Sequence, residues 1–234
     1  MPIKRSKLIN EEIYHIIIRG VEDSLIFKDE SDYYRAIFSL YEFNDTKAIE
    51  LREQRRRRKA IKASGGQSSD SRNLLIEILA FCFMPNHIHL LIKQIKEDGI
   101  TQFMRKFGTG YATYFNKKYN RKGHLFQGRF RAVYIKNNGQ LKNIFVYIHT
   151  NAISLTELKW KEFGVKNPKK LINFLENYKW SSYPDYLGIK NFPSVTKRNF
   201  IRKIIGNEKI LKNFVESWIK YKKELRDLEN IVLE

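Results

Sequence analysis

The segment "FCFMPNHIHLLIK", residues 81–93, contains two apolar runs that meet at Pro85 and Asn86. A proline followed by an asparagine suits a tight turn, and the flanking runs are rich in aliphatic and aromatic residues that favour strands. We therefore expect residues 73–83 and 87–94 to form an antiparallel β-hairpin.

Two histidines open the second strand of this hairpin. Because alternate residues of a strand point to the same side, His87 and His89 share one face, with Cβ atoms roughly 6–7 Å apart. Two imidazoles at that spacing can bind one metal ion, although two partly buried histidines with protein partners would give the same pattern. The chain has a single cysteine, Cys82, and no second spaced histidine pair, which argues against a structural zinc site. A catalytic divalent ion with open coordination positions fits better.

The segments around the hairpin alternate between strand-like and helix-like patterns. In chain order, the expected elements are a strand at 11–20, a helix at 29–43, the two hairpin strands, a helix from 100 to 118, a strand at 124–136 and a helix at 138–153. The order βαββαβα predicts an α+β fold of the ferredoxin-like (RRM-like) type, an antiparallel sheet with helices on one face.

The composition changes along the chain and suggests two parts. We expect residues 1–165 to form one domain, in which a basic and Gly/Ser-rich insertion at 46–72 lengthens the connection between the first helix and the hairpin. Residues 166–234 are expected to form a C-terminal α-helical extension with breaks near Pro184, Gly188 and Pro193.

The charge of the chain indicates a polyanionic partner. Lys and Arg total 44 and Asp and Glu total 25, which gives a formal net charge of +19. No apolar run reaches the roughly 20 residues needed to cross a bilayer, and no apolar signal-peptide core opens the chain. We therefore expect a nucleic-acid partner, no membrane partner, and a cytoplasmic, nucleoid-associated location.

The helix-like segment at 138–153 carries a candidate nucleophile. At about 100° per residue its apolar residues form one stripe, while Tyr147 and Asn151 fall together on one shoulder, one turn apart. A tyrosine can act as a covalent nucleophile, and an ion that neutralises the target phosphate would assist the attack. A boundary tyrosine followed by a helix-ending asparagine would give the same pattern.

Basic residues that alternate with aromatic rings are candidate DNA contacts. The segment "GHLFQGRFR", residues 123–131, combines cations that can pair with phosphates and aromatic rings that can stack on bases. A core strand with an exposed basic face would give the same sequence pattern. Cations on and just after the helix at 100–118 would add attraction to the DNA backbone. The candidate DNA-binding residues are His124, Phe126, Arg129, Arg131, Arg105, Lys106, Lys117, Lys118, Arg121 and Lys122.

Five motifs occur together in the order of one known family. They are "YHIIIRG" with "IFKDESDYYRAI", "MPNHIHLLI", "GHLFQGRFRAVYI", "YIHTNAI" and "WSSYPDYLG", and they extend over most of residues 11–190. On these motifs the chain resembles the REP-associated tyrosine transposases, insertion-sequence transposase-like proteins of the single-tyrosine HUH family, in which two histidines flank a hydrophobic residue. Ala152 stands where members of the family usually have a proline.

The resemblance implies an enzyme, a single-stranded DNA endonuclease and strand transferase that uses Mg²⁺ or Mn²⁺ and no nucleotide cofactor. It implies metal ligands at His87, His89 and Asn151 and a nucleophile at Tyr147, which forms a 5′-phosphotyrosine intermediate. The implied substrate is single-stranded DNA with a hairpin or palindrome. We expect a monomer, with a dimer that exchanges the tyrosine helix as the alternative.

Two other function classes stay open at this point. The first is a noncatalytic nucleic-acid-binding module that keeps the basic surface. The second is a metal-dependent hydrolase in which water attacks the phosphate in place of the tyrosine.

Overall fold

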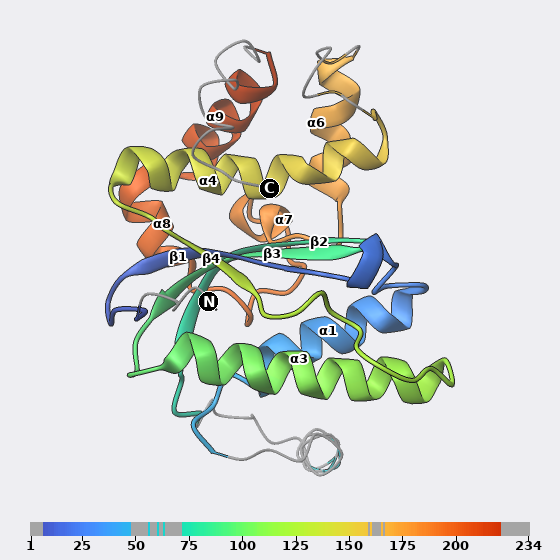
Figure 1. Cartoon of the computed structure of the whole chain (residues 1–234). Coiled ribbons are helices and arrows are strands. Elements are labelled where there is room, and N and C mark those ends of the chain that lie inside the picture. Colours follow the sequence, from blue (N-terminus) through green and yellow to red (C-terminus); the bar gives the residue numbers. More distant parts are fainter. Residues whose placement is uncertain are drawn as a thin grey trace, which may run out of the picture.

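The computed structural model describes residues 7–47, 72–158 and 167–220, together with the single residues 56, 60, 63, 160 and 165. Most of the insertion expected at 46–72 therefore lies outside the described residues. Figure 1 shows a central sheet with helices on both sides of it.

Within the described residues, the sheet has four antiparallel strands. They are β1 (Ile13–Arg19), β2 (Ile76–Met84), β3 (His87–Gln94) and β4 (Arg131–Tyr134). Their order across the sheet is β2-β3-β1-β4, which confirms the ferredoxin-like α+β prediction. The predicted hairpin is confirmed as well, because Met84 pairs with His87 across the two-residue turn at Pro85 and Asn86.

Helices α1 (Glu30–Glu42) and α3 (Gly99–Lys118) cover one face of the sheet, the lower face in Figure 1. Their buried residues form one core with alternate residues of the strands, such as Ile16 in β1 and Leu90 in β3. The apolar stripe predicted from spacing lies in this core. Its buried members on α3 are Ile100, Phe103, Met104, Phe107, Tyr111 and Phe115.

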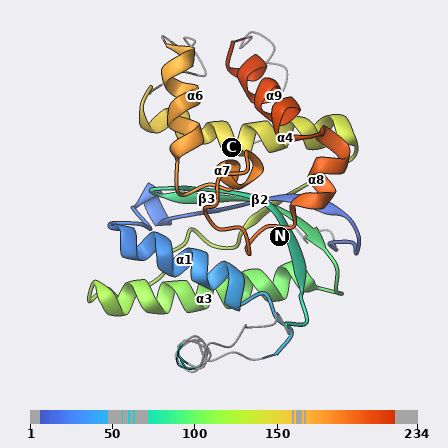
Figure 2. The ribbon, with the colours of Figure 1, turned by 180° about the vertical axis from the view of Figure 1, so that it is seen from behind.

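The upper face of the sheet is also covered, by helix α4 (Asn138–Thr150) and by helices of the C-terminal extension (Figures 1 and 2). The sequence placed helices on one face, and the structure adds this second layer. The physical reason lies in the central strands, where Leu90 belongs to the lower core and Leu91 to the upper core. A strand that is apolar on both sides needs a layer of helices on each.

The extension shares its hydrophobic core with α4 and β2. Its described helices are α6 (Pro168–Asn177), α7 (Tyr183–Tyr186), α8 (Arg198–Ile205) and α9 (Glu208–Lys220). Outside the extension, short 3-10 helices lie at η1 (Val21–Asp23), after β1, and at η2 (Asn151–Leu155), after α4. Among the described residues, no helix has both the length and the apolar character needed to cross a membrane.

Strand β4 is much shorter than the strand expected at 124–136. Gly128 adopts a left-handed backbone conformation with φ of 65°, which a continuing strand does not allow. The residues before it form a loop along the end of β1, where Gln127 N donates to Arg19 O at 2.8 Å. Phe126 and Phe130 are turned into the lower core.

The extension also covers the outer edge of β2. Phe83 N donates to Trp180 O at 2.9 Å, and Ser182 N donates to Phe81 O at 3.0 Å. Farther along the strand, Lys197 N donates to Ile78 O at 2.8 Å. These bonds satisfy backbone groups that an edge strand would otherwise leave open.

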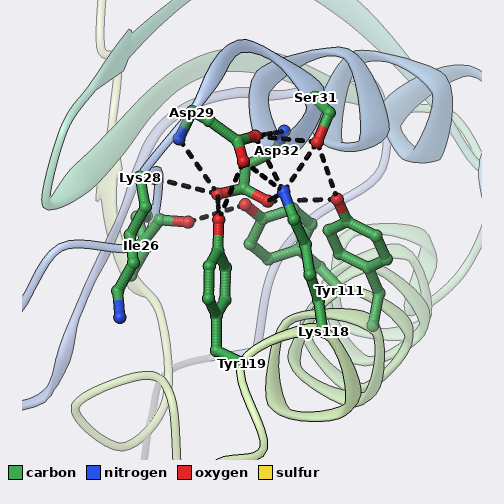
Figure 3. A network of polar contacts seen from close by, with 9 residues as sticks. Ile26, Lys28, Asp29, Ser31, Asp32, Tyr111, Lys118 and Tyr119 are labelled. Atoms are coloured by element: carbon green, nitrogen blue, oxygen red, sulfur yellow. Dashed lines mark hydrogen bonds and ion pairs between the residues drawn. The ribbon is translucent and has the colours of Figure 1, made fainter.

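An ionic cluster joins α1 to α3 on the lower side of the sheet (Figure 3). The Lys118 ammonium lies 2.7 Å from carboxylate oxygens of both Asp29 and Asp32. Tyr119 and Tyr114 donate to Asp32 at 2.7 and 3.0 Å. Burial opposes ionisation of Asp32, but the bond from Lys118 and the further donors outweigh it and lower the pKa of this carboxyl. The last turn of α3 is thereby attached to the first turn of α1.

We predict that Asp32→Ala lowers the free energy of unfolding by about 2 kcal/mol at pH 7, because Tyr114, Lys118 and Tyr119 lose the buried carboxylate that accepts from all three. Since folding lowers the pKa of Asp32, its contribution is present above the ordinary carboxyl pKa of about 4 and is lost as the pH falls below that value. Urea unfolding at pH 7 and pH 3 should therefore show a smaller difference between wild type and variant at pH 3.

The matched control is Glu30→Ala, which removes an exposed carboxylate from the same helical turn. It should change the stability by less than about 0.5 kcal/mol. Equal losses for the two variants would contradict a specific role for the cluster.

Candidate active site

His87 and His89 lie side by side on β3, on the face that α4 covers. Their ring centroids are 4.8 Å apart and their ring planes cross at 83°. His89 is buried and His87 is half-buried at the start of the strand. The structure therefore places both imidazoles on one side of the strand, as alternation requires.

The Nδ1 atom of each ring has a protein neighbour. In His87, Nδ1 lies 2.6 Å from Asn86 Oδ1, and because that oxygen only accepts, the ring nitrogen carries the proton. In His89, Nδ1 lies 2.9 Å from Nε2 of His15. A metal-binding histidine usually holds a partner with one ring nitrogen and the ion with the other. Both rings would therefore bind a cation through Nε2.

His15 of β1 is a third member of this cluster. Ile17 pairs with His89 across the two strands, so His15 is the diagonal neighbour of His89 on the same face. The two rings lie nearly in one plane, with centroids 5.1 Å apart and planes at 17°. Burial, together with the positive charge of Arg131, lowers the pKa of His15 to about 3, so its ring is neutral near pH 7. His15 is not among the predicted site residues, although strand alternation in "YHIIIRG" puts it on one face with Arg19.

Tyr147 of α4 lies above the histidines of its own chain. Its ring centroid is 5.8 Å from that of His89 and 6.0 Å from that of His15, in both cases edge to face. The side chain is half-buried. The phenol predicted as a nucleophile and the predicted histidines are thus brought together within one chain.

Asn151 closes the same helix one turn after Tyr147. It caps α4, and its Nδ2 donates to Tyr147 O at 2.8 Å. This bond uses the amide nitrogen and not Oδ1, which is the atom that binds a cation.

The candidate ligands suit a catalytic cation better than a closed metal site. Within the described ranges, no three or more His, Cys, Asp or Glu side chains form a group that could hold a metal ion. The donor set would instead be two imidazoles and one amide oxygen, which leaves coordination positions for a phosphate and is compatible with Mn²⁺ or Mg²⁺. The residues present therefore fit a divalent ion.

Comparison with protein families agrees with this geometry. Residues 9–151 match the family model described as "Transposase IS200 like", more than half of the chain, and the match includes both hairpin histidines, Tyr147 and Asn151. The chain belongs to the IS200-like transposase family. No curated protein is significantly similar to this transposase in sequence.

Two solved structures resemble the transposase at a distance. One is described as a REP-associated tyrosine transposase bound to a REP hairpin, with 15% identity, coverage of 82% of this chain and 90% of that chain, and a TM-score of 0.49. The other is tRNA(His) guanylyltransferase from Saccharomyces cerevisiae, with 10% identity, coverage of 91% and 79%, and a TM-score of 0.36. Neither similarity assigns an activity to this transposase.

The extension holds α4 in its position over the histidines. His149 Nε2 and Ser182 Oγ are 2.8 Å apart, and both side chains are buried. Ser182 Oγ also accepts from Phe81 N of β2 at 3.0 Å. On the same side of α4, Phe145 packs edge to face on Tyr186, with centroids 4.8 Å apart. These contacts link the tyrosine helix, the extension and the sheet.

Arg131 lies on the face of the sheet that carries the histidines. It pairs with Ile17 in the register between β1 and β4, and its charge influences His15. Arg19 is opposite His87 in the register between β1 and β3, and its guanidinium binds Asp23 at 2.8 Å. Two cations therefore lie beside the cluster.

Three of the other predicted DNA-binding residues lie on the opposite side of the sheet. Arg105 of α3, together with His124 and Arg129 of the loop before β4, lines a groove of about 770 Å³. Phe126 also lines this groove but is 91% buried in the lower core, which limits its surface for base stacking. The structure thus separates Arg131 from the groove residues by the thickness of the sheet.

The remaining predicted cations differ in their protein contacts. Lys118 belongs to the ionic cluster of Figure 3. Lys106 donates to Lys47 O at 2.8 Å, and Arg121 donates to His124 O at 2.8 Å, so both stabilise neighbouring segments. Lys117 and Lys122 are exposed.

We predict that Ser182→Ala lowers the free energy of unfolding by about 2 kcal/mol, because it leaves the buried His149 nitrogen and the Phe81 N–H without their common partner. Urea unfolding measures the loss. Ser194→Ala, which changes an exposed serine of the same extension, should stay within about 0.5 kcal/mol of wild type. Unchanged stability of Ser182→Ala would show that the link between α4 and the extension contributes little.

Proposed function

We propose that this transposase cleaves and rejoins single-stranded DNA through a covalent bond between Tyr147 and a 5′-phosphate. The observation that carries the proposal is the position of the Tyr147 ring, 5.8 Å from His89 and 6.0 Å from His15 between centroids, in a member of the IS200-like transposase family. A tyrosine that only filled space at the boundary of the core would have no need of imidazole neighbours, whereas this half-buried phenol lies next to two of them.

The proposed reaction exchanges one phosphate ester for another. The Tyr147 oxygen attacks the scissile phosphorus and loses its proton, the bond from phosphorus to the 3′ oxygen breaks, and that oxygen takes up a proton to leave as a 3′-OH. In the reverse direction, a 3′-OH attacks the phosphotyrosine and releases the phenol. Because one ester replaces another at each step, cutting and strand transfer need no nucleotide cofactor.

His87, His89 and Asn151 are the proposed ligands of Mg²⁺ or Mn²⁺. When bound, such an ion would neutralise charge on the scissile phosphate and favour the phenolate form of the nucleophile. The chain pre-organises the ligands itself, because Asn86 holds His87 and the backbone of Tyr147 holds Asn151. Tyr147 and Asn151 also lie on one helix, so the nucleophile and the amide keep a fixed separation.

Tyr147→Phe should abolish formation of the covalent adduct and leave single-stranded DNA binding intact. The test incubates the protein with hairpin-bearing, labelled single-stranded DNA and Mn²⁺ or Mg²⁺ and detects a protein-linked fragment on a denaturing gel. Tyr134→Phe is the matched control, because Tyr134 is exposed on β4, and it should form the adduct at the wild-type rate.

Each other result of this assay identifies a different function. Cleavage that persists in Tyr147→Phe would mean that water attacks the phosphate. Binding by the wild type without cleavage would indicate a noncatalytic nucleic-acid-binding module.

The DNA path that we propose combines the groove at α3 with the edge of the sheet at β4, which pairs with no further strand among the described residues. Arg105 and Arg129 would hold the backbone in the groove, and Arg131 on β4 would hold it near the histidines. Strand β4 is the edge strand that lies between the groove on the lower face of the sheet and the histidines on the upper face. The opposite edge, at β2, is covered by the extension.

The double variant Arg105→Ala, Arg129→Ala should weaken binding of single-stranded DNA and lower the slope of log affinity against log salt by about 1.4, which corresponds to two phosphate contacts at about 0.7 each. Fluorescence anisotropy over a series of salt concentrations measures the slope. Lys203→Ala, Lys209→Ala removes two exposed cations of the extension and is the matched control. A similar change in slope for both double variants would mean that the attraction is spread over the surface and is not concentrated in the groove.

We also propose that the working unit is a monomer in the cytoplasm, associated with the nucleoid. The support for a monomer is that the phenol and the histidines meet within one chain and that α4 is linked to the extension of the same chain through His149 and Ser182. Exchange of α4 between two chains would have to break these contacts.

A further inference from the structure

The hydrogen bond between His15 and His89 requires a defined arrangement of protons. Nε2 of His15 and Nδ1 of His89 are 2.9 Å apart, and both rings are buried. A neutral imidazole has one N–H and one lone pair, so one ring must donate and the other must accept. Two arrangements are therefore possible for this pair.

In the first arrangement His15 donates to His89. The proton of His89 then sits on Nε2, and that nitrogen cannot bind a cation. In the second arrangement His89 donates from Nδ1 to Nε2 of His15, and the Nε2 lone pair of His89 is available to a cation. Only the second arrangement is compatible with the proposed metal site.

We propose that His15 is a positioning residue that accepts the Nδ1 proton of His89 and thereby fixes both the orientation and the tautomer in which His89 binds a divalent cation. The inference rests on the proposed function, because it concerns a ligand of the cation proposed there. His15 itself would not contact the cation or the DNA.

The burial of His15 supports this role. Its side chain is fully buried in the central strand, between Ile13 and Ile17 on the same face. In the proposed arrangement Nδ1 of His15 carries the proton, and within the part of the chain that the structure describes this N–H has no hydrogen-bond partner, so the contact with His89 is the hydrogen bond that offsets the cost of burying the ring. An aliphatic residue would fill such a site without the cost of desolvating an imidazole.

The ring geometry supports it as well. The two ring planes are only 17° apart, and with centroids 5.1 Å apart and the nitrogens 2.9 Å apart the rings meet edge to edge in nearly one plane, which directs the N–H of one ring at the lone pair of the other. On the other side, the Tyr147 ring meets His89 at 89°. His89 is therefore fixed between a ring from β1 and a ring from α4.

Two variants of His15 separate the hydrogen bond from the packing. His15→Phe keeps an aromatic ring at this buried position and removes the acceptor, while His15→Gln places an amide oxygen near the position of Nε2 and keeps an acceptor. In calorimetric titrations of the full-length protein with Mn²⁺ and no DNA, His15→Phe should weaken binding by about 10- to 100-fold, the usual effect of losing the partner of a metal-bound histidine. His15→Gln should retain most of the affinity.

A measurement without any cation tests the tautomer directly. Nitrogen-15 NMR of the protein labelled in its five histidines should show His89 of the wild type protonated at Nδ1. In His15→Phe the signal should move toward the Nε2–H tautomer that neutral histidine side chains ordinarily favour. Thermal unfolding of the cation-free variants should show no loss of stability in His15→Phe, which excludes a general folding defect.

The outcomes distinguish failure of this inference from failure of the proposed function. Loss of Mn²⁺ binding in His89→Ala, with wild-type binding and an unchanged His89 tautomer in His15→Phe, would leave the cation site in place and overturn the role of His15. A wild-type His89 protonated at Nε2 would overturn it independently of any variant. Equal Mn²⁺ affinity of wild type and His89→Ala would overturn the cation site and this inference together.

Discussion

The register between β1 and β3 is the constraint on which the site depends. Ile17 pairs with His89 and Arg19 with His87, so that His15 and both hairpin histidines meet on one face under α4. A shift of one residue would turn one set of side chains to the opposite face and separate the imidazoles. The apolar residues prevent such a shift, because Ile16 and Leu90 fill the lower core and Leu91 fills the upper core. Packing on both sides of the sheet thus fixes the relative positions of the three imidazoles.

Helix α4 supplies the other half of the site, and its position is set by long-range contacts. The helix packs on the sheet through an apolar stripe, and His149 and Phe145 attach it to residues 182 and 186 of the extension. Tyr147 is on the neighbouring side of the helix, so the contacts that hold α4 do not compete with those of the phenol. The extension therefore belongs to the same structural unit as the site: it covers one sheet edge, supplies part of the upper core and fixes the angle of α4 over β3.

The features that could be predicted from the sequence are those recorded in local periodicity. The hairpin, the shared face of His87 and His89, the apolar stripe of α3 and the one-turn spacing of Tyr147 and Asn151 all follow from repeats of two or of three to four residues. The contact between His15 and His89 joins residues 74 positions apart and depends on strand register, which no local pattern contains. Lys118 was predicted to bind DNA for the same reason. A lysine on the polar face of a helix has the same sequence pattern whether it contacts DNA or, as here, two aspartates nearly 90 positions earlier in the chain. The second helical layer was missed because the run "HIIIR" reads as one apolar strand without revealing that both of its faces are covered.

The backbone bonds between β2 and residues 180–182 bear on how the protein can be divided. A fragment that ended before the extension would expose the N–H and C=O groups of a long, apolar strand, together with the upper core residues of β2 and β3. Such an edge is a template for pairing with a second copy, and fragments of this kind tend to precipitate. The histidines and the tyrosine therefore cannot be isolated as a small stand-alone module, and any engineered shorter version would have to replace the strand cover that the last third of the chain now supplies.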